Sequence, residues 1–445
     1  MILSNSKYKI DKVRIRWEPF LNSYIGVYPK RLGQNARIFS PLTVLLLDAI
    51  EKNKNENINE IIAKLSKDNS LNKDVFSDIE PFLNEMLNHG AIVKNDNKDD
   101  VRTYFINVNP KTGKSESNRY FKPTNTQISI NSECNLRCKH CYTTDNSSIE
   151  KAISLEKWKK LIDILFVNGV LLLEIVGGEP LLHKNICKFI DYAYEKNFTI
   201  RLFSNLQANN TDILDNIIAK CSIFTTLHGA CEYHDNFVRK KGAFNQTIKN
   251  IKYIKYNNGV VGIGTPINNE NISYIDDIKN IAEENKCFYL PLPILPSGRF
   301  HDFFPKYEID NYFNLYNNIL IYRPGLKNYV ANNPDKYVKI LPKGFECSAG
   351  RYFLFISSSG DIFPCPLFAN DNFNIGNIFN DNELQCWDKS EILKLFYESG
   401  ADVESDCKKC KNEECLYWCK LIIYKLTGSV KGPPSYCPKY LTKKN

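Results

Sequence analysis

The chain of 445 residues is 43% hydrophobic and 24% charged, and this length has room for two or three separate cores. No apolar run approaches the roughly 18 residues of a membrane span, and the N-terminus lacks the apolar stretch of a signal peptide, so we expect a cytoplasmic protein with no membrane partner. The net charge of +8 does not demand nucleic acid. The fifteen cysteines, an odd number, favour metal ligation over disulfides in a reducing compartment.

Residues 1–100 predict a small winged-helix-like α+β domain. Strand-like stretches lie at 12–17 and 24–28, and helical patterns follow at 58–65 and 75–87. A short strand at 91–93 closes the unit. A winged helix can bind DNA, but this one carries 15 Lys and Arg against 14 Asp and Glu, a net of +1. A net charge this small is unfavourable for binding the phosphates of DNA, so we expect no nucleic-acid partner. The polar residues 101–122 predict a linker.

Residues 123–300 alternate short apolar strands with helical segments. The strands are expected at 126–130, 170–176, 199–203, 223–227, 260–264 and 287–294. One intervening helix covers 153–169, with Gly169 as its cap. Six such units predict a parallel sheet that closes partly or fully into a (β/α)6 barrel. The alternation then stops, residues 301–346 form a bridging region, and residues 347–445 are rich in cysteine.

A first cysteine cluster directly follows the first barrel strand. Cys134, Cys138 and Cys141 have the spacing C-x3-C-x2-C. Three thiolates on a tight loop can hold three irons of a [4Fe–4S] cube, which leaves the fourth iron open to a small molecule. The loop after the carboxyl end of a strand is also where α/β folds place their chemistry. The alternatives are three buried structural cysteines, or a zinc site with His140 as a fourth ligand.

The sequence GGEP at residues 177–180 adds to this interpretation. Gly177 and Gly178 would let the backbone approach a ligand closely, and Glu179 offers a carboxylate to an ammonium group. The cysteine loop followed one βα unit later by GGEP resembles the radical S-adenosylmethionine (SAM) superfamily. The resemblance implies that the methionine amine and carboxylate of SAM bind the open iron. Reductive cleavage would then yield a 5′-deoxyadenosyl radical that abstracts a hydrogen atom.

The same resemblance implies which residues contact SAM. They are Gly177, Gly178 and Glu179 at the methionine moiety, Ser204 and Asn205 in a Thr-Asn-Gly-like turn, Thr226 in a Ser/Thr slot near SAM, and His140 where an aromatic residue packs toward adenine. Leu206 replaces the glycine of that turn. Several relatives place an arginine upstream of Gly-x-Phe, but here Val238 lies nearest that register and Arg239 is one residue away. The contact to the SAM carboxylate is therefore unassigned.

A second cysteine-rich segment resembles the SPASM extension of this superfamily. Its cysteines are Cys347, Cys365, Cys407, Cys410, Cys415, Cys419 and Cys437, with four residues between Cys410 and Cys415 where the family usually has five. The resemblance implies two auxiliary [4Fe–4S] clusters. Cys347, Cys365 and Cys419 would serve the nearer cluster, and Cys407, Cys410, Cys415 and Cys437 the farther one.

The nearer cluster has three clear ligands. Its fourth is either Cys386 or a substrate thiolate on an open iron, and a zinc-ribbon-like staple is the alternative for the whole segment. The remaining cysteines, Cys187, Cys221, Cys231 and Cys287, are expected in cores.

The N-terminal domain resembles a peptide-recognition domain that binds a leader peptide as an added β-strand. We expect the leader near residues 24–28, and a purely structural cap is the alternative. The three resemblances, in this order, are typical of enzymes that modify ribosomally made peptides, and the layout is most similar to subtilosin-type thioether maturases.

The implied cofactors are SAM and three [4Fe–4S] clusters. The implied partners are a precursor peptide with its leader and an external one-electron donor such as flavodoxin or ferredoxin. We expect a thioether cross-link from a peptide cysteine. The alternatives are a carbon–carbon cross-link or residue oxidation, as in sulfatase maturation, and a non-enzymatic iron–sulfur regulator that binds DNA. No protein side chain is nominated as a catalytic group.

Overall fold

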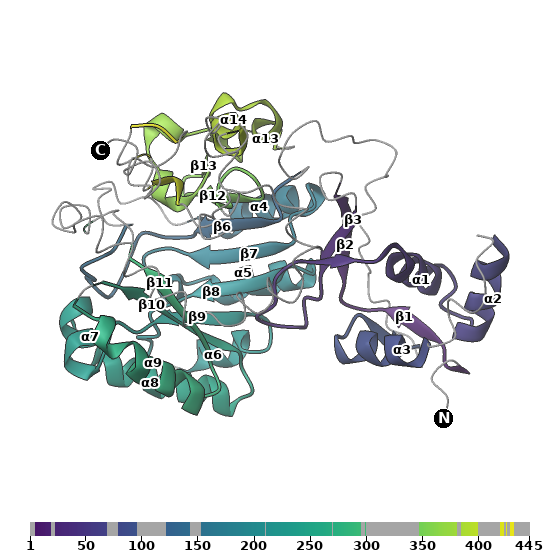
Figure 1. Cartoon of the computed structure of the whole chain (residues 1–445), viewed down its shortest axis with the longest axis horizontal. Helices are drawn as coiled ribbons and strands as arrows, with labels where there is room; N and C mark the ends of the chain where they lie inside the picture. The colour runs from purple at the N-terminus through teal and green to yellow at the C-terminus, as the bar shows by residue number, and fades with distance from the viewer. Residues whose placement is uncertain are drawn as a thin grey trace, which may run out of the picture.

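The computed structural model describes residues 5–18, 23–68, 79–95, 122–142, 153–209, 211–268, 270–294, 299, 347–380, 384–398, 419–421, 424 and 428–430. An N-terminal domain lies at one side of a central sheet (Figure 1). The C-terminal segment packs beyond β6 (Asn125–Ser129), which is the first strand of that sheet along the chain. In this described part, no helix combines the length and the apolar character needed to cross a membrane.

The N-terminal domain, described over residues 5–95, combines five strands with three helices. They are β1 (Tyr8–Ile10), β2 (Arg14–Glu18), β3 (Ser23–Val27), β4 (Arg37–Phe39), α1 (Pro41–Lys52), α2 (Ile58–Asp68), α3 (Ile79–Asn88) and β5 (Ile92–Lys94). The sequence predicted β2, β3, α2, α3 and β5 within a few residues, and did not predict α1. That helix begins at the cap Ser40, whose hydroxyl accepts from the Thr43 N–H, with Pro41 in the first turn.

The strand pairing of this domain corrects one expectation. β3 is the middle strand of the antiparallel sheet β2-β3-β4. Tyr24 pairs with Trp17 on one side and with Phe39 on the other. The expectation that a peptide adds as a strand at residues 24–28 is therefore wrong, because both edges of β3 are already occupied.

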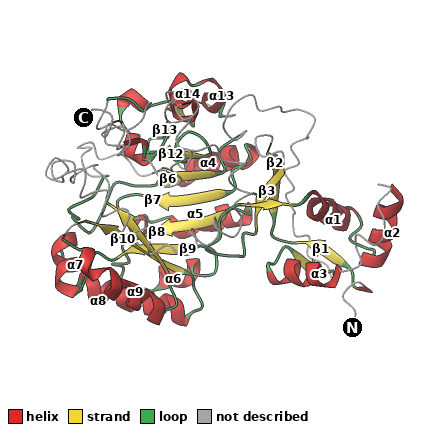
Figure 2. Ribbon diagram, viewed as in Figure 1, coloured by secondary structure: helices red, strands yellow, loops and turns green. Residues whose placement is uncertain are grey.

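The central sheet has nine strands in the order β11-β10-β9-β8-β7-β6-β12-β13-β14. Six consecutive strands of this order are parallel to one another and confirm the predicted barrel strands: β6 (Asn125–Ser129), β7 (Leu172–Val176), β8 (Thr199–Phe203), β9 (Ser222–Thr226), β10 (Val261–Ile267) and β11 (Phe288–Pro293). The helices are α4 (Leu155–Val167), α5 (Ile186–Glu195), α6 (Asp212–Ile217), α7 (Cys231–Val238), α8 (Ala243–Tyr256) and α9 (Ile275–Glu284). Helices follow the parallel strands in turn, which is the predicted α/β partial barrel (Figure 2).

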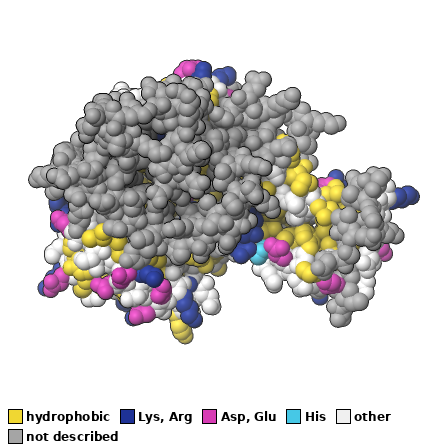
Figure 3. Space-filling model, in the orientation of Figure 1, with side chains coloured by type: hydrophobic (Ala, Val, Ile, Leu, Met, Phe, Trp, Pro, Cys, Tyr) yellow, Lys and Arg dark blue, Asp and Glu magenta, His cyan; other side chains and the backbone are white. Residues whose placement is uncertain are grey.

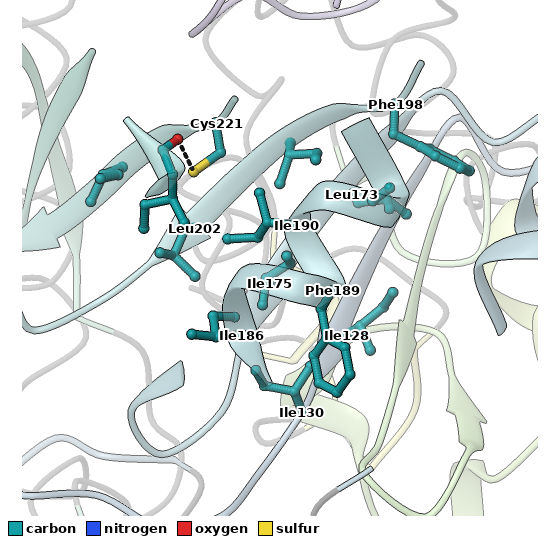
Figure 4. Close-up of a cluster of buried hydrophobic side chains, with 14 of the residues drawn as sticks. Ile128, Ile130, Leu173, Ile175, Ile186, Phe189, Ile190, Phe198, Leu202 and Cys221 are labelled. Atoms are coloured by element: carbon teal, nitrogen blue, oxygen red, sulfur yellow. Dashed lines mark hydrogen bonds between the residues drawn. The ribbon is translucent and has the colours of Figure 1, made fainter. Parts of the chain in front are cut away.

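The main core lies between the sheet and its helices. Alternate strand residues such as Ile128, Leu173 and Leu202 are fully buried there together with Phe189 of α5 (Figure 4). Cys221 belongs to this core, and its thiol contacts the Ile217 carbonyl at 3.5 Å. Cys187 and Cys287 pack against the same core, as predicted. The expectation for Cys231 is wrong, because this residue opens α7 and is exposed.

The C-terminal segment extends the barrel sheet, which the sequence did not predict. β12 (Phe353–Ile356) pairs in parallel with β6, and β13 (Asp361–Phe363) and β14 (Gly376–Asn377) follow in antiparallel fashion. Two helices complete the described segment, α13 (Gln385–Lys389) and α14 (Glu391–Glu398). The predicted ligands Cys407, Cys410, Cys415 and Cys437 lie outside the described residues.

Two buried arginines of β2 join the N-terminal domain to the barrel. The guanidinium of Arg14 lies between the rings of Phe166 and Phe198, 4.7 and 4.4 Å from their centroids. Burial, and then the charge of Arg16, lowers the pKa of Arg14 to about 9. Arg16 donates to the Gly169 carbonyl at 2.9 Å. These two side chains are structural, so the N-terminal domain has fewer cations for phosphates than its composition suggests.

Candidate functional site

The loop that follows β6 carries the first three cysteines and is hydrogen-bonded to the C-terminal end of α7. The N–H groups of Arg137 and Lys139 donate to the carbonyls of Val238 and Phe237 at 3.2 and 3.0 Å. Cys134 and Cys138 pack against a small apolar cluster of Leu136, Val238 and Ala243. The structure therefore places the predicted cysteines on one anchored loop at the carboxyl end of the barrel strands.

The thiols of this loop need a positive charge to ionise. The Cys134 sulfur accepts from the Leu136 N–H at 3.4 Å and from the Asn205 amide at 3.8 Å. Burial nevertheless raises the pKa of Cys134, and burial with the neighbouring Cys141 and Cys134 raises the pKa of Cys138 to about 12. Iron would supply the missing charge, and N–H groups aimed at sulfur are the second-sphere contacts that iron–sulfur clusters use.

Within the described residues, no three His, Cys, Asp or Glu side chains converge as the ligands of a single metal ion would. Ligands of one zinc ion at about 2.3 Å would have sulfurs within about 4 Å of one another. A [4Fe–4S] cube makes a different demand, because each thiolate binds a separate iron and the sulfurs stand apart around the cube. The shared loop of Cys134, Cys138 and Cys141 has the spacing C-x3-C-x2-C, which offers one thiol to each of three irons.

Gly177 and Gly178 bring the end of β7 against the cysteine loop. A Cβ on Gly177 would overlap Asn131, and one on Gly178 would overlap the Glu133 carbonyl. The Gly178 N–H donates to the Asn131 carbonyl at 2.9 Å, and the Glu179 N–H donates to the Glu133 carbonyl at 2.7 Å. Close packing against the cysteine loop therefore requires glycine at these two positions, which the sequence did not reveal.

Glu179 is buried and its carboxylate already has three protein donors. Oε1 accepts from the Ser204 hydroxyl at 2.7 Å and from the Leu181 N–H at 3.0 Å, and Oε2 accepts from the Asn205 N–H at 2.7 Å. Burial raises the pKa of Glu179, and these hydrogen bonds act in the opposite direction. The carboxylate joins the ends of β7 and β8, a role that spacing alone did not indicate.

The turn after β8 connects this carboxylate to the cysteine loop. The Asn205 side chain donates to Asn135 at 2.7 Å and to the Cys134 sulfur, and its oxygen accepts from the Gln207 N–H at 3.0 Å. Leu206 is fully buried and has a φ of 55°, in the left-handed region. The turn therefore keeps the backbone geometry of a glycine although a leucine occupies the position.

His140 and Thr226 lie at the same end of the barrel. The His140 ring is 4.7 Å from that of His228 and 5.3 Å from that of Phe237. Burial, and then Arg299, lowers the pKa of His140 to about 4, so the ring is neutral near pH 7. Thr226 ends β9 opposite Gly264 of β10. The edge-to-face contact of His140 with His228 was not predicted, because His228 has no spacing relation to the cysteines.

A second group of cysteines forms in the C-terminal segment. Cys347, Cys365 and Cys419 pack around one apolar cluster that includes Phe368 and Phe396. Burial raises the pKa of Cys365, and Cys347 and Cys419 raise it further. Lys420, whose pKa burial lowers, lies beside these cysteines and donates to the Val430 carbonyl at 3.3 Å.

Cys386 is part of a different group. It packs against the core of the barrel, and its Cβ lies 3.5 Å from where a side chain on Gly376 would begin. The apolar cluster around Cys347, Cys365 and Cys419 does not include it.

Comparison with known families and proteins agrees with this geometry. The profile of the radical SAM superfamily matches residues 128–282, and that of the SPASM iron–sulfur cluster-binding domain matches residues 347–411. The chain thus contains a radical SAM domain and, after it, a SPASM domain. Its first domain match begins in β6 and ends in α9, and its second begins at Cys347.

Several curated proteins resemble this chain. The antilisterial bacteriocin subtilosin biosynthesis protein AlbA of Bacillus subtilis is 27% identical over 308 residues, which cover 67% of this chain and 66% of the relative. The chain thus spans slightly less than two-thirds of AlbA. The AdoMet-dependent heme synthase of Methanosarcina barkeri is 23% identical over 68% of this chain and 93% of the relative. For the mycofactocin maturase MftC of Mycolicibacterium smegmatis these values are 23%, 68% and 80%.

Solved structures share the fold over most of the chain. Streptococcus suis SuiB bound to its precursor peptide SuiA superposes with a TM-score of 0.66 at 16% identity, over 96% of this chain and 99% of SuiB. The protein named anSMEcpe, with bound AdoMet, superposes with a TM-score of 0.56 at 16% identity, over 72% of this chain and 94% of its own. At this identity the likeness establishes the fold.

Proposed function

We propose that this protein uses SAM to modify a ribosomally made precursor peptide, and that the product is a thioether formed from a peptide cysteine. AlbA is named for subtilosin biosynthesis, and SuiB was solved with a precursor peptide, which supports a peptide substrate. The heme synthases at similar identity make a porphyrin-type substrate the second class to test.

One observation carries the thioether proposal. Cys347, Cys365 and Cys419 share an apolar cluster, and Cys386 packs elsewhere, on the barrel core. Three cysteines would hold an auxiliary cluster with one iron left to a soft ligand, and a cysteine thiolate of the peptide is such a ligand. The peptide sulfur would then be deprotonated and held in place before the bond forms, which favours one cross-link over others.

The other predicted cofactor sites are the SAM-binding cluster, the SAM site and a third cluster. Cys134, Cys138 and Cys141 would hold the cluster that binds SAM. Gly177, Gly178, Glu179, Ser204, Asn205, Thr226 and His140 would line the SAM site, and Cys407, Cys410, Cys415 and Cys437 would hold a third cluster. SAM on its cluster supplies hydrogen-atom abstraction, and an external one-electron donor of the flavodoxin or ferredoxin kind supplies the electron. The protein itself orients the peptide and excludes water.

The N-terminal domain would bind the leader peptide at β4. In the described part of the sheet β2-β3-β4, β4 is an edge strand, while the other edge, β2, is buried against the barrel. Ile38 of β4 is 41% exposed. Hydrophobic side chains also gather on the N-terminal domain beside its junction with the barrel (Figure 3). An added strand gains affinity from main-chain hydrogen bonds and specificity from such apolar contacts.

The thioether is tested with a cysteine-containing precursor peptide and anaerobically reconstituted enzyme. Each cross-link removes two hydrogen atoms from the peptide, one from the thiol and one from the acceptor carbon. The expected product is lighter by two hydrogens, no longer reacts with iodoacetamide, and resists reduction. A product of the same mass that still alkylates would be a carbon–carbon cross-link and would contradict the thioether. SAM turnover that responds to a porphyrin but to no peptide would contradict the peptide substrate.

A further inference from the structure

The segment after the last barrel strand returns to the cysteine loop at Arg299. The backbone N–H of Arg299 donates to the carbonyl of Cys141 at 3.0 Å. This bond places an arginine directly beside the third predicted ligand of the SAM cluster. It also ties the far edge of the six-stranded barrel, where β11 ends, to the loop that follows β6.

The side chain of Arg299 is half-buried, and two of its nitrogen atoms are buried without an acceptor. Its Nε and Nη2 atoms are inaccessible to solvent and have no hydrogen-bond partner in the described part of the chain. Burying such donors unpaired is costly, so this position favours an anionic ligand.

The position at which related sequences carry an arginine offers no cation here. Val238 is buried in the apolar cluster that contacts Cys134 and Cys138. Arg239 caps the end of α7 with a φ of 59° and is exposed. Arg299 therefore places a half-buried guanidinium beside the cysteine loop, where Val238 and Arg239 place none.

We propose that Arg299 binds the carboxylate of the methionine moiety of SAM. A guanidinium presents two parallel N–H groups to a carboxylate, a geometry that lysine does not reproduce. The assignment rests on the SAM binding included in the proposed function. It goes further by naming the carboxylate ligand that the sequence left open.

The test compares SAM with decarboxylated SAM, which lacks only the carboxylate. Binding of each to the full-length, reconstituted protein is measured by equilibrium dialysis. We expect Arg299→Met to weaken SAM binding about ten- to a hundredfold and to leave decarboxylated SAM unchanged, because only SAM presents the anion. Arg299→Lys keeps the charge and the fold, and should lose part of this effect. Arg239→Met is the matched control and should bind both ligands as the wild type does.

Other results would overturn the assignment. Equal losses for SAM and decarboxylated SAM would mean that Arg299 acts elsewhere on the ligand. Loss of about four irons from both Arg299 variants would mean that it holds the cluster instead. Unchanged SAM binding in both variants would also contradict it, with the proposed function intact. Failure of the wild-type protein to bind SAM would instead contradict the proposed function.

Discussion

The hydroxyl of Ser204 donates to Glu179 Oε1 at 2.7 Å and so joins the end of β8 to the end of β7. The next residue, Asn205, donates its backbone N–H to the same carboxylate at 2.7 Å and its side-chain amide to the Cys134 sulfur. A single buried carboxylate thus positions the turn that contacts the cysteine loop. We infer that changes at Glu179 act on the SAM site through this turn.

Ser204→Ala should weaken SAM binding about tenfold, because it removes one donor from a buried carboxylate. Glu179→Gln should have a larger effect, since its amide nitrogen would face the donors that Glu179 accepts from. Ser204→Thr keeps the hydroxyl and is the control. Dissociation constants of SAM, measured with iron content in parallel, check this. Wild-type affinity in both Ser204→Ala and Glu179→Gln would show that the turn does not shape the SAM site.

Leu206 should reverse the usual order of alanine and glycine. Either substitution removes a buried side chain at a cost of about 2–5 kcal/mol in the free energy of unfolding. At a φ of 55°, however, alanine keeps the left-handed strain and glycine relieves about 1 kcal/mol of it. Leu206→Gly should therefore be less destabilised than Leu206→Ala in chemical denaturation. The opposite order would mean that the turn relaxes out of the left-handed region.

Arg16→Met should destabilise the protein by about 3 kcal/mol or more, because it leaves Glu18 buried without its cation. The pair is 3.0 Å apart, with both side chains almost fully buried. The double variant Arg16→Met, Glu18→Met should recover part of this loss, since no unpaired charge remains. Denaturation of the wild type, Arg16→Met, Glu18→Met and the double variant completes the cycle. A double variant less stable than Arg16→Met would contradict the argument.

His234 should make stability fall in acid. Burial lowers its pKa to about 4, with Asp235 acting weakly in the opposite direction. The unfolded chain takes up this proton near pH 6.5, whereas the folded chain does not until about pH 4. The contribution is therefore present above pH 6.5 and is lost as the pH falls toward 4. It amounts to about 3 kcal/mol.

His234→Phe should flatten the decline of unfolding free energy between pH 6.5 and 4 relative to the wild type. The baseline stability of this variant will be lower, since the His228 N–H donates to His234 Nδ1 at 3.3 Å. The slope of the unfolding free energy against pH, and not its baseline value, tests the prediction. An equally steep decline in both proteins would mean that His234 titrates normally in the fold.

Iron content should separate Cys365 from Cys386. Three clusters predict about twelve irons in reconstituted wild-type protein. Cys365→Ala should leave about eight irons, and so should the joint change of Cys134, Cys138 and Cys141 to alanine, which should also abolish SAM cleavage. Cys386→Ala should keep about twelve. A loss of about four irons in Cys386→Ala would make that residue the fourth ligand and would contradict thiolate capture.

Local patterns determined much of this protein from the sequence. Alternating apolar runs placed all six parallel barrel strands within a few residues, because side-chain period and turn residues are set locally. The spacing of Cys134, Cys138 and Cys141 confined three thiols to one loop, since three residues of chain cannot separate them far. These features depend on neighbours in the chain, and the sequence contains those neighbours.

Relations between distant segments were decided only by the tertiary structure. Nothing near residue 24 indicates that β4 occupies the second edge of β3, and nothing near residue 353 indicates that β12 extends the barrel at β6. Arg299 meets Cys141, and Glu179 meets Ser204, because the ends of separate strands converge at one end of the partial barrel. A side chain's burial and partners come from that convergence, which no local pattern encodes.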